Sequence, residues 1–168
     1  MQKGAVLWFT GHSKSGKTAL TRLLSDELQQ RGYRVARLDS DTLPEAIIKP
    51  QADTWEERQR LKYENLSFLS RLLYEYETVV LIASVGRFRQ LRERLREQIP
   101  DYLEIYLNCP LDIRLQRDVQ GKYQTHSDYF HFYEEPERPD ILLETGQMSP
   151  EECVRLILQH LKDRGYIH

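Results

Sequence analysis

Cysteine is scarce in this chain of 168 residues: only Cys109 and Cys153 are present, and their separation does not match that of a metal site. A disulfide framework and a zinc cluster are therefore not indicated, and we expect a reducing, cytoplasmic setting. A basic excess is also missing, because 24 Lys and Arg stand against 26 Asp and Glu, for a formal net charge of -2. This balance argues against a nucleic-acid partner.

Long apolar runs are missing as well. No run approaches the roughly 20 residues that span a bilayer, and we expect no membrane partner. The first apolar run begins at Ala5, which leaves no room for a signal peptide. Internal repeats, low-complexity tracts and linkers are not found, so residues 1–168 are predicted to form one domain.

The most informative stretch runs from Gly11 to Thr18 and matches the phosphate-binding pattern G-x-x-x-x-G-K-[ST]. Its glycines allow a tight turn whose backbone N–H groups point at phosphate oxygens. Lys17 would place a positive charge at the β- and γ-phosphates, and the Thr18 hydroxyl would ligate magnesium. All eight residues are predicted to contact ATP: Gly11, His12, Ser13, Lys14, Ser15, Gly16, Lys17 and Thr18. The alternative is a strand-to-helix turn without a ligand.

Strand-like and helix-like segments alternate along the chain. Five short apolar runs are predicted to be strands: 5–10, 35–38, 78–83, 102–107 and 141–143. Helices are predicted between and after them: 18–31, 54–76, 88–98, 110–117 and 150–161, the last capped by Ser149. This alternation predicts a three-layer α/β fold of the P-loop NTPase type, with a five-stranded parallel sheet and helices on both faces. The charge run 93–97 is expected to face solvent.

Ligands of such folds bind beyond the carboxyl ends of the strands, where Asp39 and Asp41 stand. Either acid could hold magnesium through water or accept the proton of an acceptor hydroxyl; otherwise both are turn-forming residues. Arg117 is a candidate to stack on adenine or to neutralise the transferring phosphate, and Arg89 is a candidate acceptor-side cation. For both arginines the alternative is a solvated surface charge.

Residues 118–139 show no clear periodicity and concentrate aromatic and charged side chains. We predict that they form a lid that excludes water during phosphoryl transfer from ATP, the alternative being a surface loop. Phe130 and its aromatic neighbours could hold a base or close the core. The guanine-specific N-K-x-D segment of GTPases is missing. A small-molecule kinase is therefore favoured over a GTP-dependent switch.

Several further fragments occur in a recognisable order: WFTG at 8–11, SGKT at 15–18, RGYRV at 31–35, LDSD at 38–41, CPL at 109–111, RD at 117–118, EPE at 135–137 and TG at 145–146. In this order they resemble the adenylylsulfate kinase family, which phosphorylates the 3′-hydroxyl of adenosine 5′-phosphosulfate with MgATP. The resemblance implies ATP and Mg as cofactors, a nucleotide-type acceptor and a homodimer. The site residues assigned on this basis are catalytic Lys17, Asp39 and Asp41, ATP-binding Arg117 and Thr145, and acceptor-binding Arg89, Lys122 and Phe130.

The acceptor side departs from the family pattern. Two segments that contain arginine in the family are replaced here by TLPEA at 42–46 and by KYEN at 62–65. An anionic acceptor needs compensating donors, and the candidates are Arg58, Arg60, Arg87 and Lys122. The alternative function is a nucleotide-binding regulatory protein whose acceptor site has decayed. A kinase of nucleic-acid ends is disfavoured by the charge balance.

Overall fold

The computed structural model describes residues 1–125 and 128–168, so residues 126 and 127 of the predicted lid lie outside the described part. Its centre is one parallel five-stranded sheet with the order β2-β3-β1-β4-β5. The strands are β1 (Ala5–Thr10), β2 (Val35–Asp39), β3 (Val79–Ala83), β4 (Tyr102–Asn108) and β5 (Ile141–Glu144). The predicted fold class is confirmed.

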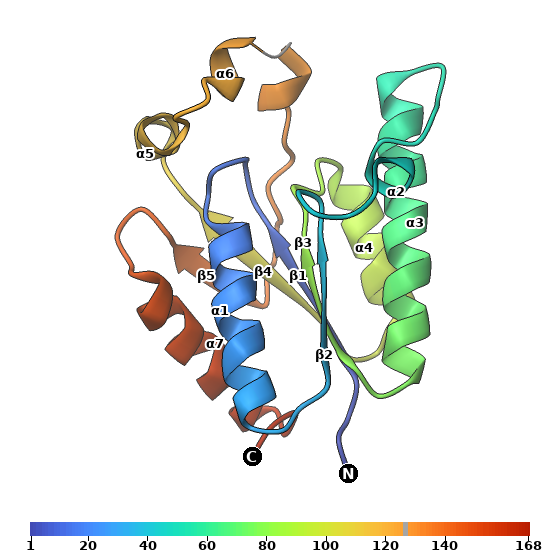
Figure 1. Cartoon of the computed structure of the whole chain (residues 1–168), viewed down its shortest axis with the longest axis vertical. Helices are drawn as coiled ribbons and strands as arrows, with labels where there is room; N and C mark the ends of the chain where they lie inside the picture. Colours follow the sequence, from blue (N-terminus) through green and yellow to red (C-terminus); the bar gives the residue numbers. More distant parts are fainter. Residues whose placement is uncertain (126–127) are drawn as a thin grey trace.

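Helices cover both faces of this sheet (Figure 1). They are α1 (Lys17–Gln30), α2 (Glu45–Ile48), α3 (Trp55–Glu75), α4 (Arg89–Gln98), α5 (Leu111–Arg117), α6 (Lys122–Thr125) and α7 (Pro150–Asp163), with a 3-10 turn, η1, at Asp128–His131. Helices α1 and α7 pack on one face, and α3 and α4 on the other. The segment with α5 and α6 lies above the carboxyl ends of the strands.

Strand β1 is buried along its whole length because it lies between β3 and β4 and has helices on both sides. Its Leu7 and Phe9 point into the α1 and α7 core, whereas Val6 and Trp8 point into the α3 and α4 core. A strand covered on both faces needs apolar residues at every position, not at alternate ones. This requirement explains the continuous apolar run that leads into the phosphate-binding loop.

The predicted strands and helices are present with ends shifted by at most two residues. Ser149 caps α7 in a reciprocal arrangement with Glu152, which confirms the predicted cap. The short elements α2, α6 and η1 were not predicted, because each spans only four residues and has no measurable periodicity. Within residues 1–125 and 128–168, no helix combines the length and apolar character needed to cross a membrane.

Candidate active site

The loop from Gly11 to Thr18 connects β1 to α1 at the carboxyl edge of the sheet. Gly11 has φ of +151°, and a Cβ atom there would lie 2.6 Å from the carbonyl oxygen of Leu107. The loop closes on itself where the Ser15 N–H donates to the His12 carbonyl over 3.2 Å. The first turn of α1 starts directly behind this curl, so the positive end of the helix dipole points at the loop.

Lys17 folds back over the same loop. Its Nζ donates to the carbonyls of Gly11 at 2.9 Å and His12 at 2.7 Å. Burial lowers the pKa of Lys17 to about 7, an effect that the nearby Asp41 carboxylate opposes and the Arg87 charge reinforces. The Lys17 ammonium also donates to the Ser15 hydroxyl over 3.4 Å. The ammonium is therefore held over the loop by neutral oxygens, which an anionic phosphate would outcompete.

The acidic residues after β2 contact the start of α1. The Thr18 hydroxyl donates to Oδ2 of Asp41 over 3.2 Å. Buried Asp39 accepts the Asp41 N–H at 2.8 Å and pairs with Arg37 at 3.2 Å. Asp39 thus fixes the backbone of Asp41, whose carboxylate stands beside Thr18. Hydroxyl and carboxylate oxygens are the ligands that magnesium prefers, so Thr18 and Asp41 fit this ion.

Arg117 joins the loop to the end of β5. Its guanidinium donates to the Lys14 carbonyl at 3.2 Å and to the Thr145 carbonyl at 2.7 Å. The structure thus brings together the two residues outside the loop that were assigned to the nucleotide, although Thr145 contributes its backbone oxygen to this contact. The predicted role of Arg117, to cover a base or to neutralise a phosphate, stays a prediction.

The segment after α5 is tied to the loop by contacts that sequence reasoning did not predict. The Tyr123 hydroxyl donates to the Ser13 carbonyl at 2.6 Å, and buried Arg114 donates to Tyr123 at 2.9 Å. On the other side, the Tyr133 ring lies 4.8 Å from the His12 ring. The predicted lid therefore contacts the phosphate-binding loop at two places among its described residues.

Two cations lie close to each other in a small pocket, and one of them, Lys62, also lies close to Asp41. Lys62 of α3 and Arg87, which follows β3, line one small pocket together with Ser84 and Phe88. Burial lowers the pKa of Lys62 to about 8; the Arg87 charge adds to this and Asp41 opposes it. Lys62 belongs to segment 62–65, which lacks the arginines that the family has there. Its neighbour Glu64 instead pairs with Arg94 of α4 at 3.8 Å and is largely exposed, so it does not place a negative charge in this pocket.

The three residues predicted to bind the acceptor differ in their surroundings. Phe130 packs on Tyr123 at 4.9 Å and under the Arg87 guanidinium at 5.5 Å, which places it near the cations. The Lys122 N–H donates to Asp118 at 3.0 Å. Arg89 donates to the Glu135 carbonyl at 2.7 Å and pairs with Glu137 at 3.2 Å, so its guanidinium is engaged by the end of the lid segment.

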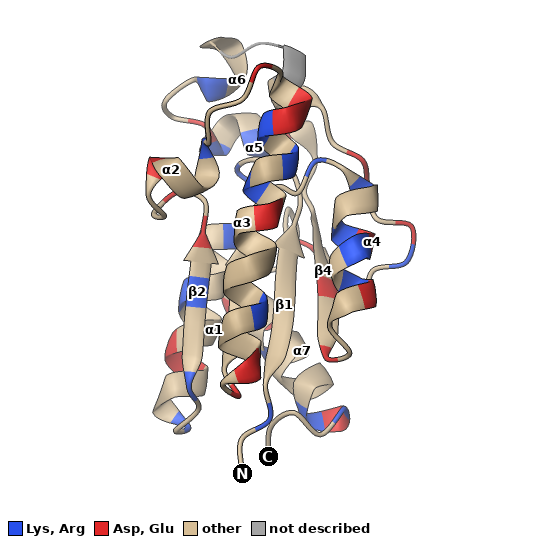
Figure 2. Cartoon of the chain, turned by 90° about the vertical axis from the view of Figure 1, so that its right-hand side faces the viewer, with Lys and Arg blue, Asp and Glu red and all other residues tan. Residues whose placement is uncertain are grey.

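The expectation that the charge run 93–97 of α4 faces solvent is wrong in part. The charge run 93–97 does not face solvent throughout, because Arg96 is partly buried and pairs with Asp140 at 2.9 Å and with Glu104 at 3.5 Å. Figure 2 shows the charged residues of α4 and the acidic position on β4. Glu104 is the one charged residue in the β4 sequence YLEIYLN. An acid in an otherwise apolar strand indicates a buried partner of opposite charge, and this was the signal in the sequence.

These features together define a P-loop phosphotransferase: a phosphate-binding loop with a lysine over it, an acid beside its last hydroxyl and a segment folded across it. Comparison with known proteins identifies the family within this class. The model of the family described as adenylylsulphate kinase matches residues 3–144, and this chain belongs to that family.

Relatives named adenylyl-sulfate kinase agree with this assignment. The one from Halothermothrix orenii is 33% identical over 99% of this chain and 94% of its own length. The one from Chloroflexus aurantiacus is 34% identical over 96% of this chain and 90% of its own length. The solved structure of the Mycobacterium tuberculosis APS kinase CysC, in complex with AMPPNP and APS, has a TM-score of 0.83 and covers 96% of this chain and 99% of its own. At 24% identity this last likeness concerns the fold.

Proposed function

We propose that this chain transfers the γ-phosphoryl group of ATP to a hydroxyl of adenylylsulfate or of a closely related nucleotide conjugate. The proposal rests on one observation. Lys17 and Asp41 lie close to two further cations, Lys62 and Arg87, so that the charges of these side chains act on one another. The first pair suits phosphoryl transfer, and the second suits an acceptor that carries negative charge.

On the donor side, the loop N–H groups and Lys17 bind the phosphates of ATP, and Arg117 borders the nucleotide between Lys14 and Thr145. Thr18 and Asp41 would hold magnesium there, which when bound neutralises charge that develops on the phosphates. Lys17 then gives up its carbonyl partners for phosphate oxygens. Its task is to stabilise the charge of the transferring group.

On the acceptor side, Asp41 accepts the proton of the attacking hydroxyl and orients it in line with the γ-phosphorus. Asp39 serves this role indirectly, because its carboxylate holds the Asp41 backbone and the Arg37 guanidinium. Lys62 and Arg87 receive the anionic part of the acceptor, and Phe130 offers an aromatic surface for its base. These two cations take the place of the arginines that segments 42–46 and 62–65 lack.

Incubation with MgATP and a panel of acceptors, following ADP release, tests the proposal. Adenylylsulfate should give acceptor-dependent ADP, and Lys62→Met should raise its KM by about tenfold while leaving ATP affinity unchanged. Lys162→Met, on the exposed end of α7, is the matched control and should behave as wild type. If no acceptor in the panel releases ADP, the kinase assignment fails.

The alternative function is a nucleotide-binding regulatory protein, favoured by the replacement of the family arginines in segment 62–65. It predicts ATP binding that depends on Lys17 but no ADP release with any acceptor.

A homodimer is a further proposal. Sedimentation of the purified chain across a hundredfold concentration range would test it.

A further inference from the structure

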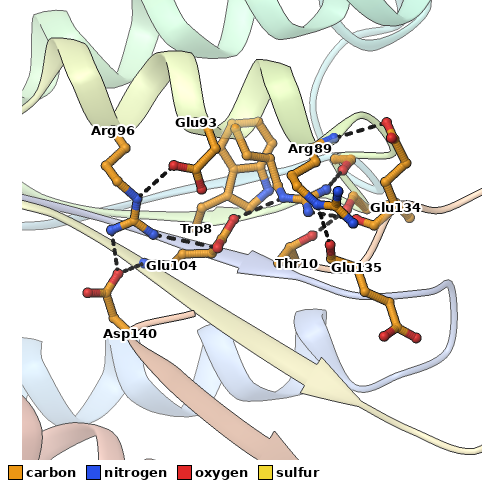
Figure 3. A network of polar contacts seen from close by, with 12 residues as sticks. Trp8, Thr10, Arg89, Glu93, Arg96, Glu104, Glu134, Glu135 and Asp140 are labelled. Carbon is orange, nitrogen blue, oxygen red and sulfur yellow. Dashed lines mark hydrogen bonds and ion pairs between the residues drawn. The ribbon is translucent and has the colours of Figure 1, made fainter. Parts of the chain in front are cut away.

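A second polar network lies behind the site, in the interior between α4 and β4 (Figure 3). Arg92 of α4 and Glu104 of β4 are both fully buried, and Nε of the arginine lies 2.9 Å from Oε2 of the acid. The two terminal nitrogens of Arg92 donate to backbone carbonyls: Nη1 to Gly86, and Nη2 to Glu134 over 2.7 Å.

Such a pair is not explained by stability alone. Burying two charges sacrifices their hydration, and well-packed apolar residues in the same space are often as stable or more so. A guanidinium, however, presents its donors in a rigid planar fork that can satisfy one carboxylate and two carbonyls together. The geometry that Arg92 uses is therefore one that an apolar side chain or a lysine cannot supply.

The two carbonyls belong to segments that carry the acceptor side of the site. Gly86 directly precedes Arg87, and Glu134 directly follows Tyr133. The two segments also bind each other, because the Glu134 N–H donates to the Arg87 carbonyl at 2.9 Å. Arg87 in turn donates to the carbonyls of Phe130 at 2.8 Å and Phe132 at 2.9 Å.

The same segment reaches the phosphate-binding loop through Tyr133. Its hydroxyl lies 2.9 Å from that of Thr10, the last residue of β1, and its ring contacts the His12 ring at a tilted angle. The Arg92 guanidinium lies 5.3 Å from the centre of the Tyr133 ring. The Arg92 side chain thus contacts three residues within segments 84–88 and 130–134, namely Gly86, Tyr133 and Glu134.

Glu104 is itself held in place. Asp140 accepts the Glu104 N–H at 2.7 Å, and the Asp140 N–H donates to the Glu104 carbonyl at 2.9 Å. Arg96 pairs with both acids on the outer side (Figure 3). The carboxylate that orients Arg92 is therefore anchored to the sheet independently of the segments that Arg92 positions.

We propose that Arg92 is a positioning residue, which Glu104 orients and which sets the place of Arg87 and of segment 130–134 over the acceptor side of the site. This inference goes beyond the proposed function but relies on it for the meaning of "acceptor side". Loss of Arg92 should loosen these two segments and weaken acceptor binding. The phosphate-binding loop, which Arg92 does not contact, should keep its affinity for ATP.

The test compares Arg92→Lys and Arg92→Met with Arg94→Met, the same change at a half-exposed position of the same helix. In hydrogen exchange followed by mass spectrometry, peptides with residues 84–89 and 130–137 should exchange about tenfold faster in both Arg92 variants and unchanged in the control. The KM for adenylylsulfate should rise by about tenfold or more, with the ATP dissociation constant changed less than about twofold.

The lysine variant separates positioning from general stability, since it keeps the charge against Glu104 but lacks the fork. If Arg92→Lys restores wild-type exchange and KM, or if ATP affinity falls as much as acceptor affinity, the proposal is overturned. Should both Arg92 variants fail to fold, Glu104→Gln, which removes the charge that orients Arg92, must show the same selective exchange. Absence of turnover with every acceptor of the panel in the wild type would refute the proposed function, while the exchange comparison would still decide the role of Arg92.

Discussion

The Thr18 hydroxyl donates a hydrogen bond to Oδ2 of Asp41 over 3.2 Å, which joins the first turn of α1 to the loop after β2. This contact places a carboxylate beside the phosphate-binding loop. We expect Asp41→Asn to lower kcat by about 10²–10⁴-fold, because an amide cannot accept the proton of the acceptor hydroxyl. ATP binding measured by calorimetry without metal should hardly change. Wild-type turnover in this variant would contradict the role of Asp41.

Asp39→Asn should act differently. Asp39 is buried and pairs with Arg37, so the amide would leave that guanidinium without its counter-charge. We expect a loss of about 1–3 kcal/mol in the free energy of unfolding, measured in urea at pH 7. If Asp39→Asn instead lowers kcat at unchanged stability, the direct catalytic role first predicted for this acid would be favoured.

Proton uptake should accompany ATP binding above neutral pH. Burial lowers the pKa of Lys17 to about 7, so without bound ATP the Lys17 side chain is mostly neutral at pH 8. A phosphate anion stabilises the ammonium and raises its pKa, so binding at pH 8 should take up about one proton and at pH 6 almost none. Calorimetry in Tris and in HEPES measures this difference. Lys17→Arg should abolish the uptake. Equal proton uptake at pH 6 and pH 8 in the wild type would contradict the assignment of the uptake to Lys17.

Acid should destabilise the protein through His12. Burial, reinforced by the charge of Arg114, lowers the pKa of His12 to about 4. Between pH 6.5 and 4 the unfolded chain therefore binds a proton that the folded chain does not, and the free energy of unfolding should fall by roughly 1–3 kcal/mol as the pH drops. Urea unfolding at several pH values checks this slope. His12→Phe, which keeps a ring against Tyr133, should flatten it, and His168→Phe at the exposed end of the chain should not.

Gly86 should tolerate no side chain. It has φ of +60°, and a Cβ atom there would lie 3.0 Å from Cδ of Arg92 and 3.1 Å from Cζ2 of Trp8. Gly86→Ala should therefore lower the free energy of unfolding by about 2–4 kcal/mol. Gly32→Ala is the control, because Gly32 has φ of +86° with no atom within 4 Å of the added Cβ, and it should lose only about 1 kcal/mol. Equal losses would show that Arg92 and Trp8 yield easily.

The fold was predictable because its signals are local. Five apolar runs indicate strands covered on both faces, and the loop pattern together with the fragments around it indicates the donor side. Arg92 shows where this reasoning ends. In the α4 sequence RQLRERLREQ nothing local separates fully buried Arg92 from half-exposed Arg94. Their difference is set by Glu104 and Glu134, twelve and 42 residues away along the chain.

The acceptor side was less accessible for the same reason. Lys62 was named only as part of a segment that lacks the family arginines, and its importance depends on how Arg87 and Asp41 fold towards it. Tyr123 likewise had no predicted role, yet its hydroxyl binds the Ser13 carbonyl across 110 positions of the chain. Contacts of this kind arise from the packing of distant segments, which a pattern in a short window cannot contain.

The position of β1 at the centre of the sheet has a consequence for biosynthesis. Its two neighbours are β3, in register from Val79, and β4, in register from Tyr102, so both are translated long after it. This fully buried strand must therefore leave the ribosome without a pairing partner, and its pairing is complete only after β3 and then β4 have emerged. Parallel pairing between such distant segments is slow to form. The nascent chain exposes the sequence that will become the nucleotide site during the interval in which chaperones act.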